Sequence, residues 1–294
     1  MRLARVRTTE GPCSAVVSAD QRAVHLLPGD GLTVDYVVRA GTAALAEVQA
    51  AACDVPAVPL SRIELLPPLG RFNRDILCVG WNYLDHFYES KGRREGQEPE
   101  RLPDHPTFFT KGPDTVIAAH EAIALDEQLS KRWDYEAELA IVIGRDGRSI
   151  KEEDALSHVF GFCVANDVSQ RDLQRAHGGQ WLKGKSIDQT MPLGPWITTR
   201  DEVEISDLTI SCELNGHLVQ CASTADMIFP VERIIAELSR GMTLRAGDII
   251  LTGTPSGIGN ARTPPLYLRD RDVLVTRIST LGELRNPVVA TALV

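Results

Sequence analysis

The chain contains the run Leu208-Thr209-Ile210-Ser211-Cys212-Glu213-Leu214-Asn215-Gly216-His217-Leu218-Val219-Gln220. Apolar and polar residues alternate from Leu208 to Leu214, which is the period of a strand with one buried face. Asn215-Gly216 then supplies the two residues that a type I′ turn needs, because both central positions of that turn have positive φ. The run therefore predicts a β-hairpin with a two-residue turn.

Most other elements predicted after residue 70 are strands as well. Compact apolar runs of strand length occur at residues 76–79, 139–143, 248–252 and 273–278. One amphipathic helix is predicted after Pro230, because apolar residues recur at i, i+3, i+4 and i+7 from Val231, and Gly241 can end the helix. Strands outnumber helices, which favours a β-rich barrel or sandwich with peripheral helices over a doubly wound parallel sheet.

Residues 1–70 are predicted to form a small α/β domain. Apolar runs at 15–17 and 24–27 indicate short strands, and residues 33–41 carry the N-cap and glycine signals of a helix. An Ala-rich stretch follows at 42–52. Residues 65–70 contain two prolines and a glycine, which interrupt regular structure. We therefore predict a boundary at residue 70, with a larger domain over 71–294.

Composition and charge exclude several classes of protein. The 294 residues are 43% hydrophobic and 24% charged, which is typical of a globular chain. No apolar run is long enough to span a bilayer and no secretory segment is recognised, so we expect a cytoplasmic protein without membrane contact. The net charge is −9 and no Lys/Arg cluster has aromatic residues interleaved, which argues against a nucleic-acid partner. The six cysteines are dispersed, so they predict neither a zinc cluster nor a disulfide framework.

Three acidic residues are candidate metal ligands. Glu136 and Glu138 are two residues apart, so within a strand they point to the same face. Asp167 follows the apolar run 160–165, as a residue at the end of a strand does. A shared hard cation would relieve the repulsion between such carboxylates. Taken singly, the alternatives are a solvated strand edge for the glutamates and an N-cap or turn for Asp167.

His86 and Glu89 are a candidate acid–base pair. In a helical turn over residues 83–90 they stand at i and i+3 on one face. A carboxylate bonded to one imidazole nitrogen fixes the tautomer and raises the basicity of the other, as a water-activating base requires. The alternative is an ordinary pair on a helix surface.

Two further segments contain candidate anion-binding groups. Lys185 lies in a Gly/Pro-rich segment, 180–196, where a lysine can bind a substrate carboxylate or enolate oxygen; the alternative is a solvated loop lysine. Residues 244–259 combine a strand with a glycine-rich turn whose backbone N–H groups can hold an anion. This turn lacks the Gly-Lys-Ser/Thr ending of a P-loop, so it does not indicate nucleotide binding.

These motifs occur together and in one order, and in this the chain resembles the fumarylacetoacetate hydrolase family over most of residues 75–294. The segments that carry the resemblance are 80–83 with His86 and Glu89, 134–140, 166–172, Lys185-Ser186 with 192–195, and 252–255. Their conjunction is far more specific than any one of them, and it outweighs the alternative interpretation of each carboxylate.

The resemblance implies a mixed, β-rich α+β fold, a β-sandwich roll that is usually a homodimer. It implies Mg²⁺ or Mn²⁺, with Ca²⁺ also possible, bound by Glu136, Glu138 and Asp167. It places His86 and Glu89 as the catalytic dyad and Lys185 near the substrate oxyanion. The substrate-binding residues that it implies are Arg171, Gln174, Lys185 and Thr254.

The expected substrate is a small anionic 2-oxo acid. Our leading hypothesis is an acylpyruvate-type hydrolase that cleaves a C–C bond of a 2,4-dioxo acid, with His86 activating water and pyruvate leaving as a metal-bound enolate. The same enolate would serve a 2-hydroxyhepta-2,4-diene-1,7-dioate isomerase or an oxaloacetate-type decarboxylase. A non-catalytic ligand-binding protein with the same fold is the hypothesis of another class, and the retention of every candidate site residue argues against it.

Two features depart from the family pattern. Trp81 stands where leucine is usual, and we expect it to narrow the pocket. Residues 90–105 are longer and more charged than a minimal connection. They are predicted either to form a lid over the substrate or to be a solvated insertion.

Overall fold

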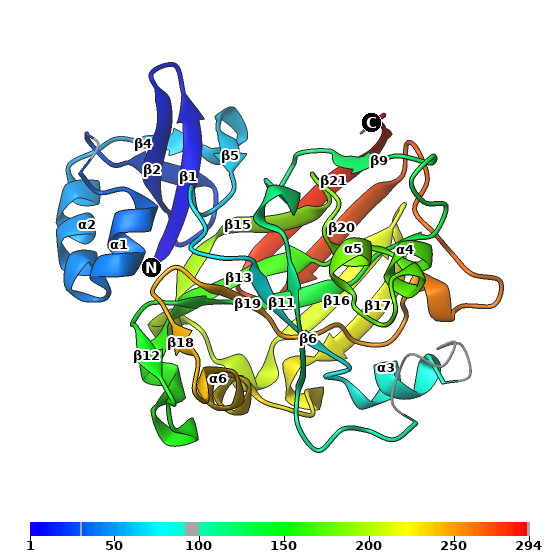
Figure 1. Ribbon diagram of the computed structural model, residues 1–294. Coiled ribbons are helices and arrows are strands. Elements are labelled where there is room, and N and C mark those ends of the chain that lie inside the picture. Colours follow the sequence, from blue (N-terminus) through cyan, green and yellow to red (C-terminus); the bar gives the residue numbers. More distant parts are fainter. Residues whose placement is uncertain (30, 92–99, 293–294) are drawn as a thin grey trace.

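The computed structural model describes residues 1–29, 31–91 and 100–292. It is rich in strands and has few, short helices, as Figure 1 shows, which confirms the predicted mixed β-rich fold class. Two sheets contain most of the strands, one of twelve strands and one of five.

The central part of the large sheet carries the residues of interest. Its strands are β6 (Ile76–Gly80), β7 (Thr107–Lys111), β8 (Val116–Ile117), β11 (Ala137–Ile143), β13 (Val159–Asn166), β15 (Met191–Thr199) and β19 (Ile249–Leu251). β11 and β13 pair antiparallel and are buried along their whole length. Their sequences are nearly continuous apolar runs because each strand is covered on both faces.

The five-stranded sheet contains the predicted hairpin. Its strands are β9 (Ile123–Leu125), β16 (Thr209–Leu214), β17 (His217–Ser223), β20 (Val273–Ile278) and β21 (Gly282–Ala290). Leu214 pairs with His217, and the turn residues Asn215 and Gly216 have φ of 54° and 80°. Both values are positive, so the type I′ turn is confirmed.

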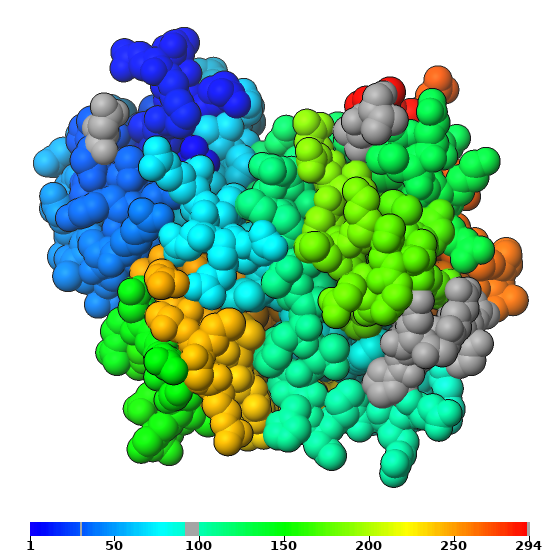
Figure 2. Space-filling view, viewed as in Figure 1, coloured from blue at the N-terminus to red at the C-terminus, as the bar shows by residue number. Residues whose placement is uncertain are grey.

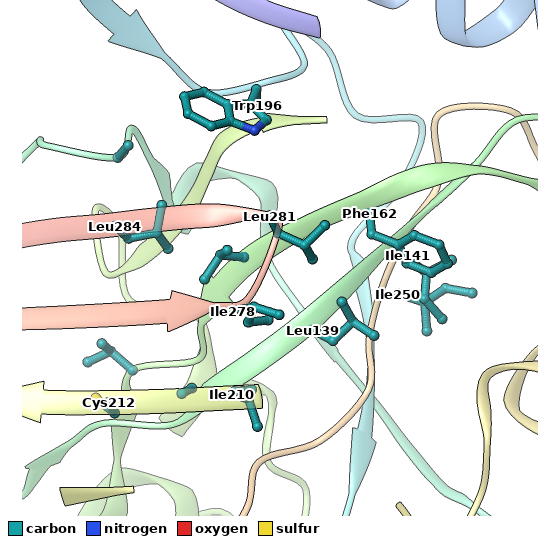
Figure 3. Packing of buried hydrophobic residues seen from close by; sticks show 14 of the residues in the cluster. Leu139, Ile141, Phe162, Trp196, Ile210, Cys212, Ile250, Ile278, Leu281 and Leu284 are labelled. Carbon is teal, nitrogen blue, oxygen red and sulfur yellow. The ribbon is translucent and has the colours of Figure 1, made fainter. Parts of the chain in front are cut away.

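The main core lies between these two sheets. Figure 3 shows Leu139, Ile141 and Phe162 of the large sheet packed toward Ile210 and Ile278 of the smaller one. The neighbouring residues of β11 point to the other face, where they join a second apolar cluster with the N-terminal helices. The large sheet therefore forms a middle layer, and β11 is covered by apolar residues on both faces.

The N-terminal unit extends the large sheet. Its elements are β1 (Arg2–Thr8), β2 (Gly11–Val17), β3 (Ala23–Leu26), α1 (Val34–Ala40), α2 (Ala43–Cys53), β4 (Ala57–Pro59) and β5 (Glu64–Leu66). Leu3 of β1 pairs with Ile197 of β15, so the sheet continues from this unit into the core. The two units pack closely in Figure 2, where the N-terminal residues are blue. The predicted break at 65–70 begins later than expected, because Leu65 and Leu66 belong to β5. The boundary at residue 70 stays a prediction.

Shorter elements surround the two sheets. The helices are α3 (Leu84–Glu89), α4 (Arg171–Ala176), α5 (Leu182–Lys185) and α6 (Val231–Ser239), and the small strand pairs are β10 (Trp133–Asp134) with β14 (Ser169–Gln170) and β12 (Gly147–Arg148) with β18 (Thr243–Leu244). In the part of the chain that the structure describes, 3₁₀ turns cover Leu60–Arg62, Pro113–Thr115, Glu152–His158, Arg200–Glu202, Ile205–Asp207, Thr224–Asp226 and Gly259–Ala261. α6 confirms the predicted amphipathic helix, with Pro230 as its N-cap. Within the described ranges, no helix has the length and apolarity needed to cross a bilayer.

The burial of β11 leads to a testable prediction about the stability of the protein. Ile141 is fully buried on β11, so Ile141→Ala leaves a cavity and is expected to cost about 3 kcal/mol of unfolding free energy. Val289, on β21, is 42% exposed, and Val289→Ala is expected to change that free energy by less than about 0.5 kcal/mol. Urea denaturation followed by circular dichroism measures both. Equal losses in the two variants would contradict the assignment of β11 to the centre of the core.

Candidate metal centre

The three predicted metal ligands lie together. Each of Glu136, Glu138 and Asp167 offers an oxygen, and these oxygens are all within 4.8 Å of one another. All three side chains are buried. The β11–β13 pairing joins Ala137 to Asn166, and the Asp167 N–H donates to the Glu136 carbonyl at 2.8 Å, which brings the two chain segments side by side. Glu136 precedes β11, so the expectation that both glutamates belong to one strand is wrong for Glu136.

Two of the cationic side chains that contact this cluster are Lys185 and Arg171. The Lys185 ammonium donates to Asp167 Oδ2 at 2.7 Å and also to Glu136 Oε2. Arg171 donates from Nη2 to Glu136 Oε1 and from Nε to Asp134 Oδ2, the latter at 2.9 Å. Lys185 is the last residue of α5 and is buried, so the alternative of a solvated loop lysine is excluded.

The pKa values of the two glutamates in the cluster are shifted in opposite directions. Burial alone would raise the pKa of Glu136, but Arg171 and Lys185 outweigh it and hold that pKa well below its usual range. Burial raises the pKa of Glu138 well above its usual range, and the charges of Asp167 and Glu136 raise it further. Among the described residues no cationic side chain forms an ion pair with Glu138, and the charge of Lys185 offsets the rise in its pKa only in part.

A hard divalent cation fits this donor set. Three carboxylate oxygens suit Mg²⁺ or Mn²⁺, which typically bind a few carboxylates together with water or substrate. The under-compensated Glu138 is the group that such a cation would stabilise most. Its Oε2 also accepts a bond of 2.7 Å from the Gly253 N–H, which fixes its direction. Gly253 has φ of 92°, and a Cβ there would lie 2.8 Å from the Asn82 Cβ, so this contact requires glycine.

The predicted dyad forms on α3. His86 Nδ1 lies 2.7 Å from Glu89 Oε1, and Glu89 Oε2 accepts from the Gly257 N–H at 2.8 Å. With both carboxylate oxygens engaged, Nδ1 carries the proton that it donates to Glu89. Nε2 is then the nitrogen that can exchange a proton with a substrate. His86 lines the same pocket as Glu136 and Glu138.

The remaining predicted residues also line this pocket. Arg171 Nη1 donates to Gln174 Oε1 at 3.1 Å, and Gln220 Nε2 donates to Thr254 Oγ1 at 2.8 Å. The lining thus contains Glu136, Glu138, His86, Arg171, Gln174, Lys185 and Thr254. Asp167 and Glu89 contact lining residues instead of lining the cavity themselves.

Aromatic side chains form one wall of the pocket. Trp81 and Trp181 pack edge to face with ring centroids 4.7 Å apart, and Phe109 lies 5.0 Å from Trp181. Trp81 holds a φ of 53°, which is rare for a bulky residue and strains the backbone at this wall. The cavity that remains measures about 40 Å³, which holds only a few water molecules.

Sequence reasoning missed three polar residues that support the site. Asp134 accepts from Arg171 and from the Gly259 N–H, Gln220 bonds both Thr254 and the Ala137 N–H, and Lys111 contacts Asp167. Lys111 had one signal, its position at the end of an apolar strand. Half of the segment predicted as a lid or a solvated insertion, residues 92–99 of 90–105, lies outside the described residues.

Comparisons with known proteins agree with this geometry. The family described as "Fumarylacetoacetate (FAA) hydrolase C-terminal" matches residues 75–289. The chain belongs to the fumarylacetoacetate hydrolase family. Members of this family are enzymes and commonly use a divalent metal, which agrees with the buried acidic triad.

Individual relatives within the family differ in reaction. The chain is 42% identical over 230 residues to oxaloacetate tautomerase YisK of Bacillus subtilis (strain 168), covering 78% of this chain and 74% of the relative. A fumarylacetoacetate hydrolase from Exiguobacterium antarcticum is 36% identical with a TM-score of 0.84, over 99% of this chain and 100% of that one. A 2-hydroxyhepta-2,4-diene-1,7-dioate isomerase from Mycobacterium marinum is 29% identical with a TM-score of 0.76, over 99% of each chain.

The uneven electrostatics of the triad give a prediction about metal binding. Glu138→Gln removes one of three repelling charges but keeps an oxygen for the Gly253 N–H. The metal-free variant is therefore expected to unfold at a higher temperature than the metal-free wild type. Mn²⁺ is expected to stabilise the wild type, by about 2.7 kcal/mol at a hundred times its dissociation constant, and to leave the variant nearly unchanged. Thermal unfolding with and without Mn²⁺ measures both effects.

Glu153→Gln is the matched control, because the Glu153 side chain is exposed and pairs only with the surface residue Lys151 among the ion pairs of the described chain. This control is expected to respond to Mn²⁺ as the wild type does. Equal stabilisation of the wild type and Glu138→Gln by Mn²⁺ would contradict Glu138 as a ligand.

Proposed function

We propose that this protein is a divalent-metal-dependent tautomerase that interconverts the enol and keto forms of oxaloacetate or of a closely similar four-carbon 2-oxo diacid. The observation that carries the proposal is the His86–Glu89 pair, which places a proton-transferring imidazole in the same narrow pocket as the carboxylate triad. The 42% identity to an oxaloacetate tautomerase supports it.

The reaction needs one proton to move and no covalent bond between heavier atoms to break. The enol loses the proton on its C2 oxygen, C3 gains a proton, and the C2–O bond becomes a carbonyl. His86 Nε2 is suited to transfer this proton, because Glu89 holds Nδ1 at 2.7 Å and keeps the imidazole oriented. Glu89 remains the hydrogen-bond acceptor throughout.

The charged groups around the triad stabilise the oxyanion that forms at C2. A divalent cation held by Glu136, Glu138 and Asp167 would supply Lewis-acid polarisation of the 2-oxo oxygen. The Lys185 ammonium, buried between two of these carboxylates, offers further positive charge at the same place. Arg171 and Gln174 line the pocket and would orient the carboxylate of the substrate.

The size of the pocket supports a small substrate. Trp81 and Trp181 close one wall, and the cavity measures about 40 Å³. A four-carbon diacid demands less widening of this wall than a seven-carbon diene-dioate. Hydrolysis also requires room for a water molecule beside the substrate, whereas tautomerisation consumes no water.

Acylpyruvate hydrolysis, the leading hypothesis from the sequence, is the second candidate. The oriented imidazole of His86 could equally activate water, and the similarity to a fumarylacetoacetate hydrolase favours this reaction. Isomerase and decarboxylase activities would use the same triad and lysine. The predicted homodimer and cytoplasmic location stay predictions.

The first functional prediction concerns the dyad. With Mn²⁺ present, the purified protein is expected to accelerate the decay of the ultraviolet absorbance of enol-oxaloacetate. His86→Ala is expected to lower kcat by about 100-fold or more, because general acid–base groups typically contribute that much. Glu89→Gln is expected to lose less, since it keeps the imidazole in place. His217→Ala, which changes an exposed histidine that does not line the pocket, is the control and is expected to keep full activity. Full activity in His86→Ala would contradict the proposed proton transfer.

The second functional prediction separates the candidate reactions. Wild-type protein is offered oxaloacetate, acetopyruvate and 2-hydroxyhepta-2,4-diene-1,7-dioate, with Mn²⁺ and then with EDTA. Ketonisation of oxaloacetate is expected to have the highest kcat/KM and to stop with EDTA. Faster release of acetate and pyruvate from acetopyruvate would place hydrolysis first, and faster release of CO₂ from oxaloacetate would place decarboxylation first. Activity that survives EDTA would exclude the metal-dependent mechanism.

A further inference from the structure

Lys111 is a fully buried lysine at the end of β7. Lysine is almost never found at this degree of burial unless its charge is paired, because removing an ammonium from water costs several kcal/mol. The Lys111 ammonium is paired with a single carboxylate among the described residues, that of Asp167, at 3.0 Å from Oδ1. It also donates to the carbonyl of Val168 at 2.8 Å.

Both contacts fall on one short turn. Asp167 and Val168 connect β13 to β14, so Lys111 holds the candidate ligand and the backbone that follows it. The other carboxylate oxygen of Asp167, Oδ2, accepts from Lys185, which also donates to Glu136 Oε2. Lys185 thus hydrogen-bonds Oδ2, whereas Lys111 forms an ion pair with Oδ1, which has no hydrogen-bond partner among the described residues. The two ammonium groups lie against opposite oxygens of the carboxylate and oppose its rotation.

The same strand also positions Lys185. Phe109 precedes Lys111 by two residues on β7, so their side chains leave the same face. The Lys185 ammonium lies 5.0 Å from the centroid of the Phe109 ring, and the Gly112 N–H donates to Ser186 Oγ at 2.9 Å. β7 and the residue after it therefore support Asp167 on one side and the end of α5 on the other.

From these contacts we propose that Lys111 is a positioning residue of the metal centre, which acts through Asp167 by fixing the direction of its carboxylate toward Glu136 and Glu138. The proposal rests on the metal dependence of the proposed function. Lys111 does not line the pocket, so it acts without touching the substrate.

A purely electrostatic role and a positioning role of Lys111 predict opposite changes in cation affinity when this lysine is removed. If Lys111 only balanced charge, its removal would leave the triad more negative and would strengthen cation binding. If Lys111 positions Asp167, its removal frees the carboxylate to turn and weakens cation binding. Residues that orient metal ligands typically change affinity or activity by about 10–100-fold. The sign of the change in affinity therefore separates the two roles.

The experiment measures Mn²⁺ binding by isothermal titration calorimetry on wild-type protein, Lys111→Met, Lys111→Arg and the surface control Lys151→Met. Lys111→Met is expected to weaken Mn²⁺ binding by about 10–100-fold, Lys111→Arg to recover most of the affinity, and the control to match the wild type. Electron paramagnetic resonance of bound Mn²⁺ is expected to show a changed ligand environment in Lys111→Met.

A second uncharged variant, which keeps a hydrogen-bond donor, covers the case in which Lys111→Met fails to fold. Lys111→Gln retains an N–H for the Val168 carbonyl but has no charge, and if Lys111→Met does not fold, Lys111→Gln is expected to bind Mn²⁺ more weakly than the wild type. Unchanged or tighter binding in the uncharged variants would overturn the proposal, as would Lys111→Arg that binds no better than they do. Wild-type protein that binds no Mn²⁺ would overturn both this proposal and the metal dependence of the proposed function, whereas normal wild-type binding with unaffected variants would overturn this proposal alone.

Discussion

The structure depends on the neutralisation of buried carboxylates. Asp134, Glu136, Glu138 and Asp167 are all buried within one region, and in water-poor surroundings such charges persist only with cationic partners. Among the described residues, three cationic side chains contact them, namely Lys111, Arg171 and Lys185. One more carboxylate than cation is present, and the raised pKa of Glu138, caused by burial and by Asp167 and Glu136, marks it as the carboxylate least compensated. A divalent cation answers this imbalance directly.

The sheets meet this constraint by ending apolar strands at the site. β11 and β13 are buried along their lengths, and the carboxylates occur just before β11, on its second residue and just after β13. Placed further along either strand, a carboxylate would face the core between the sheets and would lack a partner. The cations come from β7, α4 and α5, which pack around the same ends. The charge cluster is thus a product of strand pairing that joins segments distant in the chain.

Local patterns allowed much of this to be predicted from the sequence. The Asn215-Gly216 turn and α6 are determined by residues that are close in the chain, so the local sequence was sufficient to predict both. The grouping of Glu136, Glu138 and Asp167 followed from motif order more than from geometry, since Glu136 lies outside the strand that was expected to hold it. Lys111 was missed because its one signal, a position at the end of a strand two residues after Phe109, is equally typical of a lysine that emerges into solvent. Its burial results from Asp167, 56 residues later, and the pairing of β1 with β15 is likewise non-local.

The cations that contact the carboxylate triad and the aromatic wall of the pocket determine different properties of the site. Lys111, Lys185 and Arg171 determine how firmly the carboxylates are held, which concerns the cation and the oxyanion that every candidate reaction shares. Trp81 and Trp181 determine how much of a substrate fits beside them. Hydrolysis requires a remote acyl group and a water in addition to the shared 2-oxo acid head, whereas tautomerisation requires only that head and a mobile proton. Trp81, whose backbone is strained, narrows the pocket and therefore disfavours hydrolysis more than tautomerisation. This difference in the space required is the physical reason for proposing tautomerisation first.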